Sequence, residues 1–273
     1  MVRLQLVGGG RMGEALLGGL LAGGWCEPAD VVVVEQLEAR RDELAGRYAG
    51  VAVTDVIGPS EGAIVAVKPG DVAGVCTELG AAGVGRILSI AAGVTLPALE
   101  QAVAAGVGDR AAGGADALPA VVRAMPNTPA LVGAGASAIA AGSDAGPDDL
   151  DWADGILSAV GIVVRVPEAQ LDAVTGLSGS GPAYVFLVAE SLIEAGVLSG
   201  LPRDVSERLA VQTLVGSALL LRDGDADAAQ LRAGVTSPGG TTAAGLRALE
   251  DRAVRAAFLA AVDAATARSR ELG

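Results

Sequence analysis

Short apolar runs rich in β-branched residues alternate with helical segments along the first part of the chain. The helical segments include Gly13–Ala22 and Leu37–Tyr48. Near-continuous apolar strands that alternate with helices are typical of an α/β fold with a doubly wound, parallel sheet. We therefore predict one α/β domain over residues 1–166. Its expected strands are Val2–Val7, Val31–Glu35, Val51–Thr54, Ala63–Val67, Arg86–Ile90, Val121–Met125, Ser137–Ala141 and Ile162–Val166.

After Pro167 the strand pattern disappears, and residues 167–273 are predicted to form an all-helical domain. Within it, Pro182–Ala189 is apolar on every side, unlike a surface helix. Such a segment fits the core of one compact domain or, as we favour, a core shared between two copies of the chain. The expected helices are Pro182–Leu198, Pro202–Leu221, Ala226–Ala233, Thr242–Leu249 and Arg252–Glu271.

The composition narrows the class of protein. Hydrophobic residues make up 51% of the 273 positions, so the chain can bury a sizeable core. Aromatic residues make up 2% and the net charge is −13. Neither base stacking nor phosphate neutralisation therefore favours a nucleic-acid partner. The chain has no histidine, which excludes His-based triads and His metal sites, and we expect no metal.

Several features indicate a cytoplasmic protein without a membrane partner. Cys26 and Cys76 are too few for a disulfide framework. The first residues lack the apolar core of a signal peptide. The longest uncharged stretch, Ala124–Ser143, contains prolines and glycines and fits a loop followed by a strand better than a membrane span.

A glycine-rich motif, Gly8-Gly9-Gly10-Arg11-Met12-Gly13, follows the first expected strand and opens a helix. In dinucleotide-binding motifs of this spacing, the first glycine permits a tight turn, and the second lets the backbone approach a pyrophosphate. The third permits close packing of helix and strand. The pyrophosphate then lies on the helix N-terminus. We predict a Rossmann-like dinucleotide-binding domain; the alternative is a glycine-rich turn without a ligand.

Glu35 lies at the end of the second expected strand, near the acidic position that bonds the adenosine ribose hydroxyls in such motifs. A carboxylate there repels a 2′-phosphate, so Glu35 favours NADH over NADPH. The alternative is a solvated glutamate at a strand end.

Lys68 is the chain's single lysine and lies at the carboxyl end of the fourth expected strand. Ligands bind outside the carboxyl ends of strands in such sheets. Lys68 is thus a candidate catalytic or cofactor-binding residue, although chance in an arginine-biased composition would also place a lone lysine there.

Another glycine-rich stretch, Thr236–Thr242, precedes an expected helix. Its backbone N–H groups would lie at a helix N-terminus and could bind a carboxylate. Simple N-capping by Ser237 or Thr241 is the alternative.

The segment Val235–Thr242, followed by Leu246 and Leu249-Glu250, resembles the signature of the pyrroline-5-carboxylate reductase family. The resemblance covers essentially the whole chain, because further blocks agree in order. These blocks are Gly8–Gly13, Ala66–Pro69, Ala91–Thr95, Met125–Pro129 and Gly176–Tyr184. One departure is Glu35, since the family often has a neutral or basic residue there.

The resemblance implies NADH- or NADPH-dependent reduction of a small cyclic imine, Δ1-pyrroline-5-carboxylate, to L-proline, the last step of proline synthesis. It implies a Rossmann domain and a helical dimerisation and substrate domain, with homodimers that often form decamers of five dimers. Thr242 is implied to lie by the ring nitrogen. The implied substrate-binding residues are Ser237, Gly239, Gly240, Thr241 and Thr242. The motif and the resemblance together give as cofactor-binding residues Gly8, Gly10, Arg11, Met12, Gly13, Glu35, Ala66, Val67, Lys68, Pro69, Ala91, Ala92, Gly93, Asn127 and Pro182.

Two other functions fit parts of the sequence. A β-hydroxyacid dehydrogenase also joins a Rossmann domain to a helical domain, but its catalytic lysine lies in the second domain. No lysine follows Pro167 here, which disfavours this class. A nucleotide-sensing module would bind the cofactor without turnover, which an activity assay distinguishes.

Overall fold

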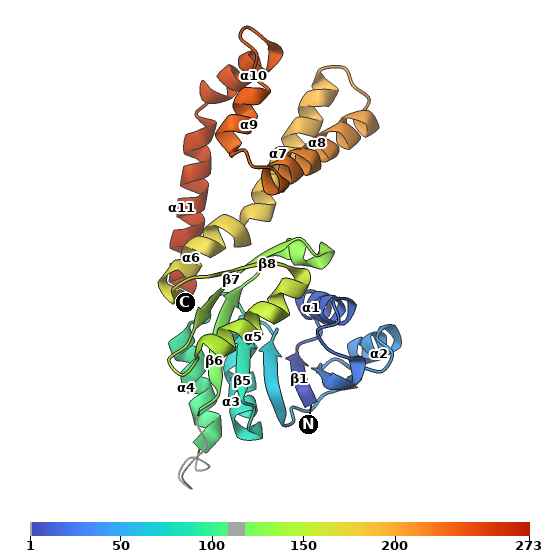
Figure 1. The fold of residues 1–273 in the computed structure, drawn as a ribbon, viewed down its shortest axis with the longest axis vertical. Coiled ribbons are helices and arrows are strands. Elements are labelled where there is room, and N and C mark those ends of the chain that lie inside the picture. Colours follow the sequence, from blue (N-terminus) through green and yellow to red (C-terminus); the bar gives the residue numbers. More distant parts are fainter. Residues whose placement is uncertain (1, 109–117) are drawn as a thin grey trace. The chain divides into compact units, whose positions relative to one another are not determined.

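The computed structural model describes residues 2–108 and 118–273, and the chain divides into two compact units (Figure 1). The first unit comprises residues 1–180 together with 265–273. The second unit comprises residues 181–264. The first unit carries the sheet, and the second is entirely helical.

The contacts divide the chain after Ser180, whereas the sequence pattern changes at residue 167. The helical segment between these positions packs with the first unit, as do the last residues of the chain. The Ser269 hydroxyl ties the two segments together, because it donates a hydrogen bond to the Asp172 carboxylate over 2.7 Å.

One eight-stranded sheet forms the first unit, with the strand order β3-β2-β1-β4-β5-β6-β7-β8. Neighbouring strands from β3 to β6 pair in parallel, as the apolar runs predicted. The strands are β1 (Val2–Val7), β2 (Val31–Val34), β3 (Ala52–Thr54), β4 (Ser60–Val65), β5 (Arg86–Ser89), β6 (Ala120–Met125), β7 (Gly135–Ala141) and β8 (Gly161–Arg165).

The expectation of a fully parallel sheet is wrong at one edge. Strand β7 pairs antiparallel with β6, and β8 pairs parallel with β7. A parallel return needs a crossover of about a dozen residues or more. Between Met125 and Gly135 the chain has only the short 3₁₀ segment η4, so β7 folds back beside β6.

Helices cover both faces of the sheet, as in doubly wound folds. Leu16 and Leu20 of α1 and Ile156 of α5 belong to one buried cluster, whereas Leu79 of α3 and Leu99 of α4 belong to another. The helices of this unit are α1 (Arg11–Ala22), α2 (Glu38–Arg47), α3 (Val72–Ala82), α4 (Leu96–Val107), α5 (Pro147–Leu157) and α6 (Leu171–Val174). The shorter turns are η1 (Pro28–Asp30), η2 (Pro69–Asp71), η4 (Thr128–Val132), η5 (Ser158–Val160), η6 (Glu168–Gln170) and the π turn η7 (Thr175–Gly179).

The second unit has almost no core of its own. Among the described residues, Ala210 is its one buried hydrophobic side chain. Its helices are α7 (Gly181–Leu198), α8 (Arg203–Asp223), α9 (Ala228–Gly234), α10 (Thr241–Glu250) and most of α11 (Val254–Leu272). Helix α7 packs along α8. The exposed apolar side chains of α7 include Val185, Phe186, Leu187, Leu192, Val197 and Leu198.

One apolar helical stretch that includes α7 has the length of a membrane span. The stretch Glu168–Leu198 is long enough to cross a bilayer, and an 18-residue window within it has a mean hydropathy of 1.4. Length and hydropathy are also those of a helix that packs in the core of a soluble assembly. The π turn η7 interrupts regular α-helix within the stretch.

Candidate active site

A cleft of about 700 Å³ lies at the carboxyl ends of β1, β2 and β4. The sheet order places β2 on one side of β1 and β4 on the other, and ligands bind at such switch points. The cleft brings together six of the residues that the sequence nominated for cofactor binding. They are Gly8, Gly10, Glu35, Ala66, Val67 and Lys68.

The glycine-rich turn has the steric requirements that the motif predicted. Gly8 has a φ of +104°, and a Cβ there would lie only 2.5 Å from the Ala66 carbonyl oxygen. A Cβ on Gly13 would overlap the carbonyl oxygen of Gly8, so helix α1 could not start so close to the turn. At Gly10 a Cβ would meet nothing within 4 Å, which leaves open space beside the backbone.

The start of α1 presents donors without acceptors. Gly10 is the N-cap residue, and no side chain caps the helix. In the part of the chain that the structure describes, the N–H groups of Gly10, Arg11 and Met12 donate to no protein acceptor. Free N–H groups at a helix N-terminus attract anions. This end of α1 therefore fits the pyrophosphate of a dinucleotide.

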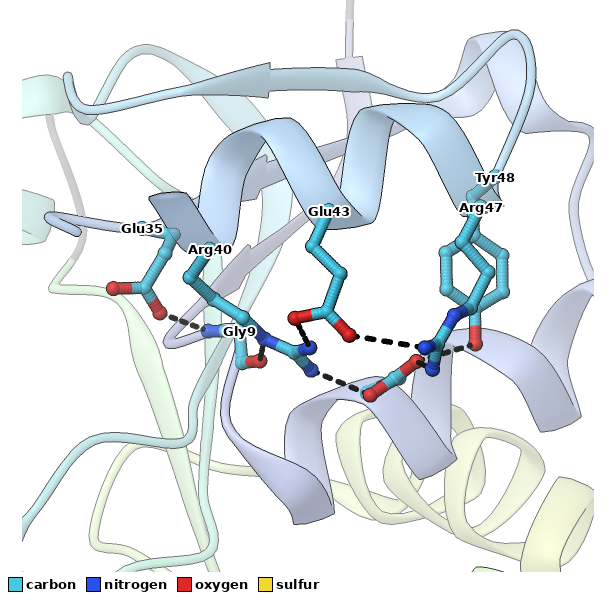
Figure 2. A network of polar contacts seen from close by, with 7 residues as sticks. Gly9, Glu35, Arg40, Glu43, Arg47 and Tyr48 are labelled. Atoms are coloured by element: carbon cyan, nitrogen blue, oxygen red, sulfur yellow. Dashed lines mark hydrogen bonds and ion pairs between the residues drawn. The ribbon is translucent and has the colours of Figure 1, made fainter. Parts of the chain in front are cut away.

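Glu35 follows β2 and turns its carboxylate toward the glycine-rich turn (Figure 2). One carboxylate oxygen accepts a hydrogen bond from the Gly9 N–H over 2.9 Å. The other accepts one from the Leu37 N–H, also over 2.9 Å. Glu35 is thus hydrogen-bonded to the backbone on both sides, and its contact with the adenosine ribose stays a prediction.

Behind the turn, a network of charged side chains joins α2 to α1 (Figure 2). The Arg40 guanidinium pairs with Glu14 over 2.5 Å and with Glu43 over 2.6 Å. Arg47 pairs with the same two carboxylates. Arg40 also donates from Nε to the Gly9 carbonyl oxygen over 2.8 Å.

The network favours the ionised form of Glu14. Burial alone raises the pKa of this carboxyl, but hydrogen bonds from Arg40 and Arg47 outweigh burial and lower the pKa below its ordinary value. Sequence reasoning missed this network. The spacing of Arg40, Glu43 and Arg47 along one helix face was readable, but their shared contact with Glu14 depends on how α1 packs against α2.

Lys68 lies between β4 and η2, with its side chain exposed. Among residues 2–108 and 118–273, no carboxylate forms an ion pair with it, and it lines the cleft. Arginines such as Arg40, Arg86 and Arg123 pair with carboxylates, whereas the exposed Lys68 is a cation available to a ligand.

The structure places other nominated residues outside this cleft. Ala91 is buried after β5, Ala92 is exposed, and Gly93 lies near the last turn of α11. Asn127 follows β6, and its side-chain amide joins two backbone segments. It donates to the Ser178 carbonyl oxygen over 3.0 Å and accepts from the Ala136 N–H over 2.8 Å. Pro69 opens η2, next to the lining residues Lys68 and Gly70.

In the second unit, the nominated substrate residues form the connection from α9 to α10. Helix α10 starts at Thr241 with Gly240 as its N-cap, and no side chain caps it. The expected alternative, a cap by Ser237 or Thr241, is therefore wrong. The Gly240 N–H donates to the Ser237 carbonyl oxygen over 3.0 Å, which closes the turn. Thr242 is half-buried, whereas Thr241 is exposed. Pro182 lies in the first turn of α7.

The described ranges contain no cluster of three or more cysteine, aspartate or glutamate side chains arranged to hold a metal ion.

Comparisons with known proteins agree with both units. A family model for pyrroline-5-carboxylate reductase dimerisation matches residues 168–272, and one for NADP oxidoreductase, coenzyme F420-dependent, matches residues 3–93. The pyrroline-5-carboxylate reductase of Synechocystis is 45% identical, over 100% of this chain and 98% of its own length. The chain belongs to the pyrroline-5-carboxylate reductase family. The Mycobacterium tuberculosis reductase is 43% identical over 100% of this chain and 97% of its own.

Solved structures of family members have the same fold. The reductase of Coxiella burnetii superimposes with a TM-score of 0.88 at 34% identity, covering 100% of this chain and 98% of that chain. The Plasmodium falciparum enzyme, solved with NADP bound, gives a TM-score of 0.81 at 28% identity with the same coverage. These findings confirm the predicted family, fold class and enzyme class, a pyrroline-5-carboxylate reductase. They do not favour a β-hydroxyacid dehydrogenase.

Proposed function

We propose that this reductase converts Δ1-pyrroline-5-carboxylate to L-proline with NADH as the preferred reductant. The observation that carries the proposal is the uncapped start of α1 in the cleft, within a chain of this family. The fit to a nicotinamide dinucleotide rests on the open space at Gly10 and the free N–H groups beside it. When bound, the dinucleotide supplies the hydride that reduces the imine carbon.

The residues of this chain bind and orient the reactants. The turn Gly8–Gly13 holds the phosphates, and Glu35, the carboxylate that contacts this turn, bonds the adenosine ribose. The uncapped start of α10 suits the substrate carboxylate, because its N–H groups carry partial positive charge. The Thr242 hydroxyl is our candidate hydrogen-bond partner for the ring nitrogen.

The reaction needs no strong general acid. An imine of this kind accepts a proton readily near neutral pH, and the chain has no histidine to supply one. Positioning of the two reactants then contributes most of the rate acceleration.

Loss of NADH absorbance tests the proposal directly. We expect turnover with pyrroline-5-carboxylate, and none with 2-ketoacids, nor with 3-hydroxyacids and NAD⁺ in the reverse direction. Binding of NADH without turnover would instead identify a nucleotide-sensing module and overturn the proposed activity.

We expect kcat/KM to be higher with NADH than with NADPH by a factor of roughly 5 to 150, because Glu35 places a negative charge where the 2′-phosphate would bind. The Plasmodium falciparum relative, solved with NADP bound, supports the use of a nicotinamide dinucleotide. It also makes the ratio of the kcat/KM values for NADH and NADPH worth measuring.

Glu35→Ser should narrow the ratio of the two kcat/KM values. Because Glu35 also holds the Gly9 N–H, we expect this variant to bind NADH more weakly as well. Glu38→Ser is the control, since Glu38 is exposed and does not line the cleft. An equal or higher kcat/KM for NADPH in the wild type would contradict the assignment.

Lys68→Met should raise the dissociation constant for NADH by about 10-fold, because a hydrogen bond to a charged group contributes about 1.5–3 kcal/mol. Thermal stability should change little, since the side chain is exposed and has no described ion-pair partner. Lys68→Arg should also be impaired, because a planar guanidinium does not replace a compact ammonium. Unchanged binding and kinetics in both variants would leave Lys68 without a role.

Further proposals concern assembly and location. The dimerisation family model supports a homodimer, with residues 167–273 as the helical dimerisation and substrate domain and residues 1–166 as the dinucleotide-binding domain. A decamer of five dimers is a larger assembly that sedimentation would detect. The two cysteines are free and buried, which supports a cytoplasmic location.

A further inference from the structure

The peptide groups on either side of Gly9 are held by two charged side chains. Glu35 accepts from the Gly9 N–H, and Arg40 donates to the Gly9 carbonyl oxygen (Figure 2). We propose that Arg40 is a positioning residue for the cofactor phosphates, which holds the Gly9–Gly10 peptide so that the Gly10 N–H faces them. The inference rests on the proposed function, in that the turn binds a nicotinamide dinucleotide.

The geometry of the peptide bond carries the first step. The described chain has no cis peptide bond, so the Gly9 carbonyl and the Gly10 N–H point in opposite directions from one rigid plane. Arg40 holds the carbonyl on the side of α2. The Gly10 N–H is thereby directed away from α2, and Gly10 lines the cleft.

The glycine content of the turn explains why a side chain is needed to fix the orientation of this peptide. Three successive glycines leave the turn with more conformational freedom than any other residues would. A peptide held at its carbonyl by a cation is also polarised, which makes its N–H a stronger donor to an anion. Arg40 thus reduces the freedom of the turn and strengthens its donor before the cofactor arrives.

The contacts of Arg40 show that it acts on the turn from the side of α2 and not from within the cleft. Its Nε bonds Gly9, and its two terminal nitrogens pair with Glu43 and Glu14. With each guanidinium nitrogen engaged, Arg40 is not itself a phosphate ligand. Its side chain is 20% exposed, whereas that of Arg47 is 54% exposed.

Arg47 provides a matched control within the same network. It pairs with Glu14 and Glu43, as Arg40 does, but it makes no bond to the turn. If Arg40 served only to join α1 and α2, loss of either arginine would have the same kind of effect. Arg47 is more exposed than Arg40, and only Arg40 contacts Gly9.

The test measures dissociation constants by titration calorimetry of the full chain with NADH and with ADP-ribose, which carries the pyrophosphate without the nicotinamide. We expect Arg40→Gln to weaken both ligands by about 10-fold, because a charge-assisted bond that orients the donor is lost. Arg47→Gln should stay within about 2-fold of the wild type, as is usual for an exposed ion pair. At saturating NADH, kcat should be unchanged in both variants.

Arg40→Lys keeps the positive charge and replaces Arg40→Gln as the test variant if the glutamine variant does not fold. One ammonium cannot replace three directed guanidinium nitrogens. We therefore expect dissociation constants between those of the wild type and those of Arg40→Gln. Equal affinities in the Arg40 and Arg47 variants would overturn the positioning role alone. A wild type that binds neither NADH nor ADP-ribose would overturn the proposed function, and this inference with it.

Discussion

Replacing Thr242 with alanine should lower kcat by roughly 10- to 100-fold, if its hydroxyl bonds the ring nitrogen as that atom gains charge or a proton. Thr242 is the second residue of α10 and is half-buried, beside N–H groups that no side chain caps. An interaction that strengthens only in the transition state lowers kcat and kcat/KM together. Steady-state kinetics over a range of pyrroline-5-carboxylate concentrations measures both.

Thr241→Ala is the matched control. Thr241 precedes Thr242 in the first turn of α10, but it is exposed, and its hydroxyl caps nothing. We expect near wild-type kinetics from this variant. A higher KM with unchanged kcat in Thr242→Ala would show that the hydroxyl binds ground state and transition state equally. Equal losses in the two variants, or near wild-type kinetics for Thr242→Ala, would show that the hydroxyl is structural and that water supplies the proton.

Phe186→Asp should dissociate the proposed homodimer and abolish most activity at micromolar concentration. Phe186 lies on α7 and is 63% exposed in a single chain. An unpaired charge buried at an interface is destabilising by about 3–5 kcal/mol, which weakens association by at least roughly 100-fold. Light scattering should then report a 26.7 kDa species in place of one twice that mass.

The control for this variant is Val56→Asp. Val56 is 66% exposed and lies in the first unit, outside the dimerisation family match. We expect it to leave the mass unchanged. A stable and active wild-type monomer at micromolar concentration would contradict the shared-core interpretation of α7, as would a dimeric Phe186→Asp variant.

The hydrophobic pattern alone determined most of the fold. Each expected strand corresponds to an observed one. For the buried parallel strands in the middle of the sheet, the reason is that such a strand needs a short, nearly continuous apolar run. The positions of Gly8 and Gly13 were also readable, since the turn and the close packing there tolerate no side chain. The family signature near the C-terminus then gave the enzyme class, which the comparisons confirm.

Only the tertiary structure decided the reversed direction of β7 and the partners of the charged residues in the site. Strand β7 turns back against β6 over the short connection after Met125, and the apolar pattern does not specify this pairing direction. The spacing of Arg40 and Glu43 is local to one helix and could be read in advance. The contacts of Gly9 with Glu35 and Arg40 join residues 26 and 31 positions apart. Such contacts form only when the chain's path brings β1, β2 and α2 together, because side-chain type and spacing fix neighbours within one element but not between elements.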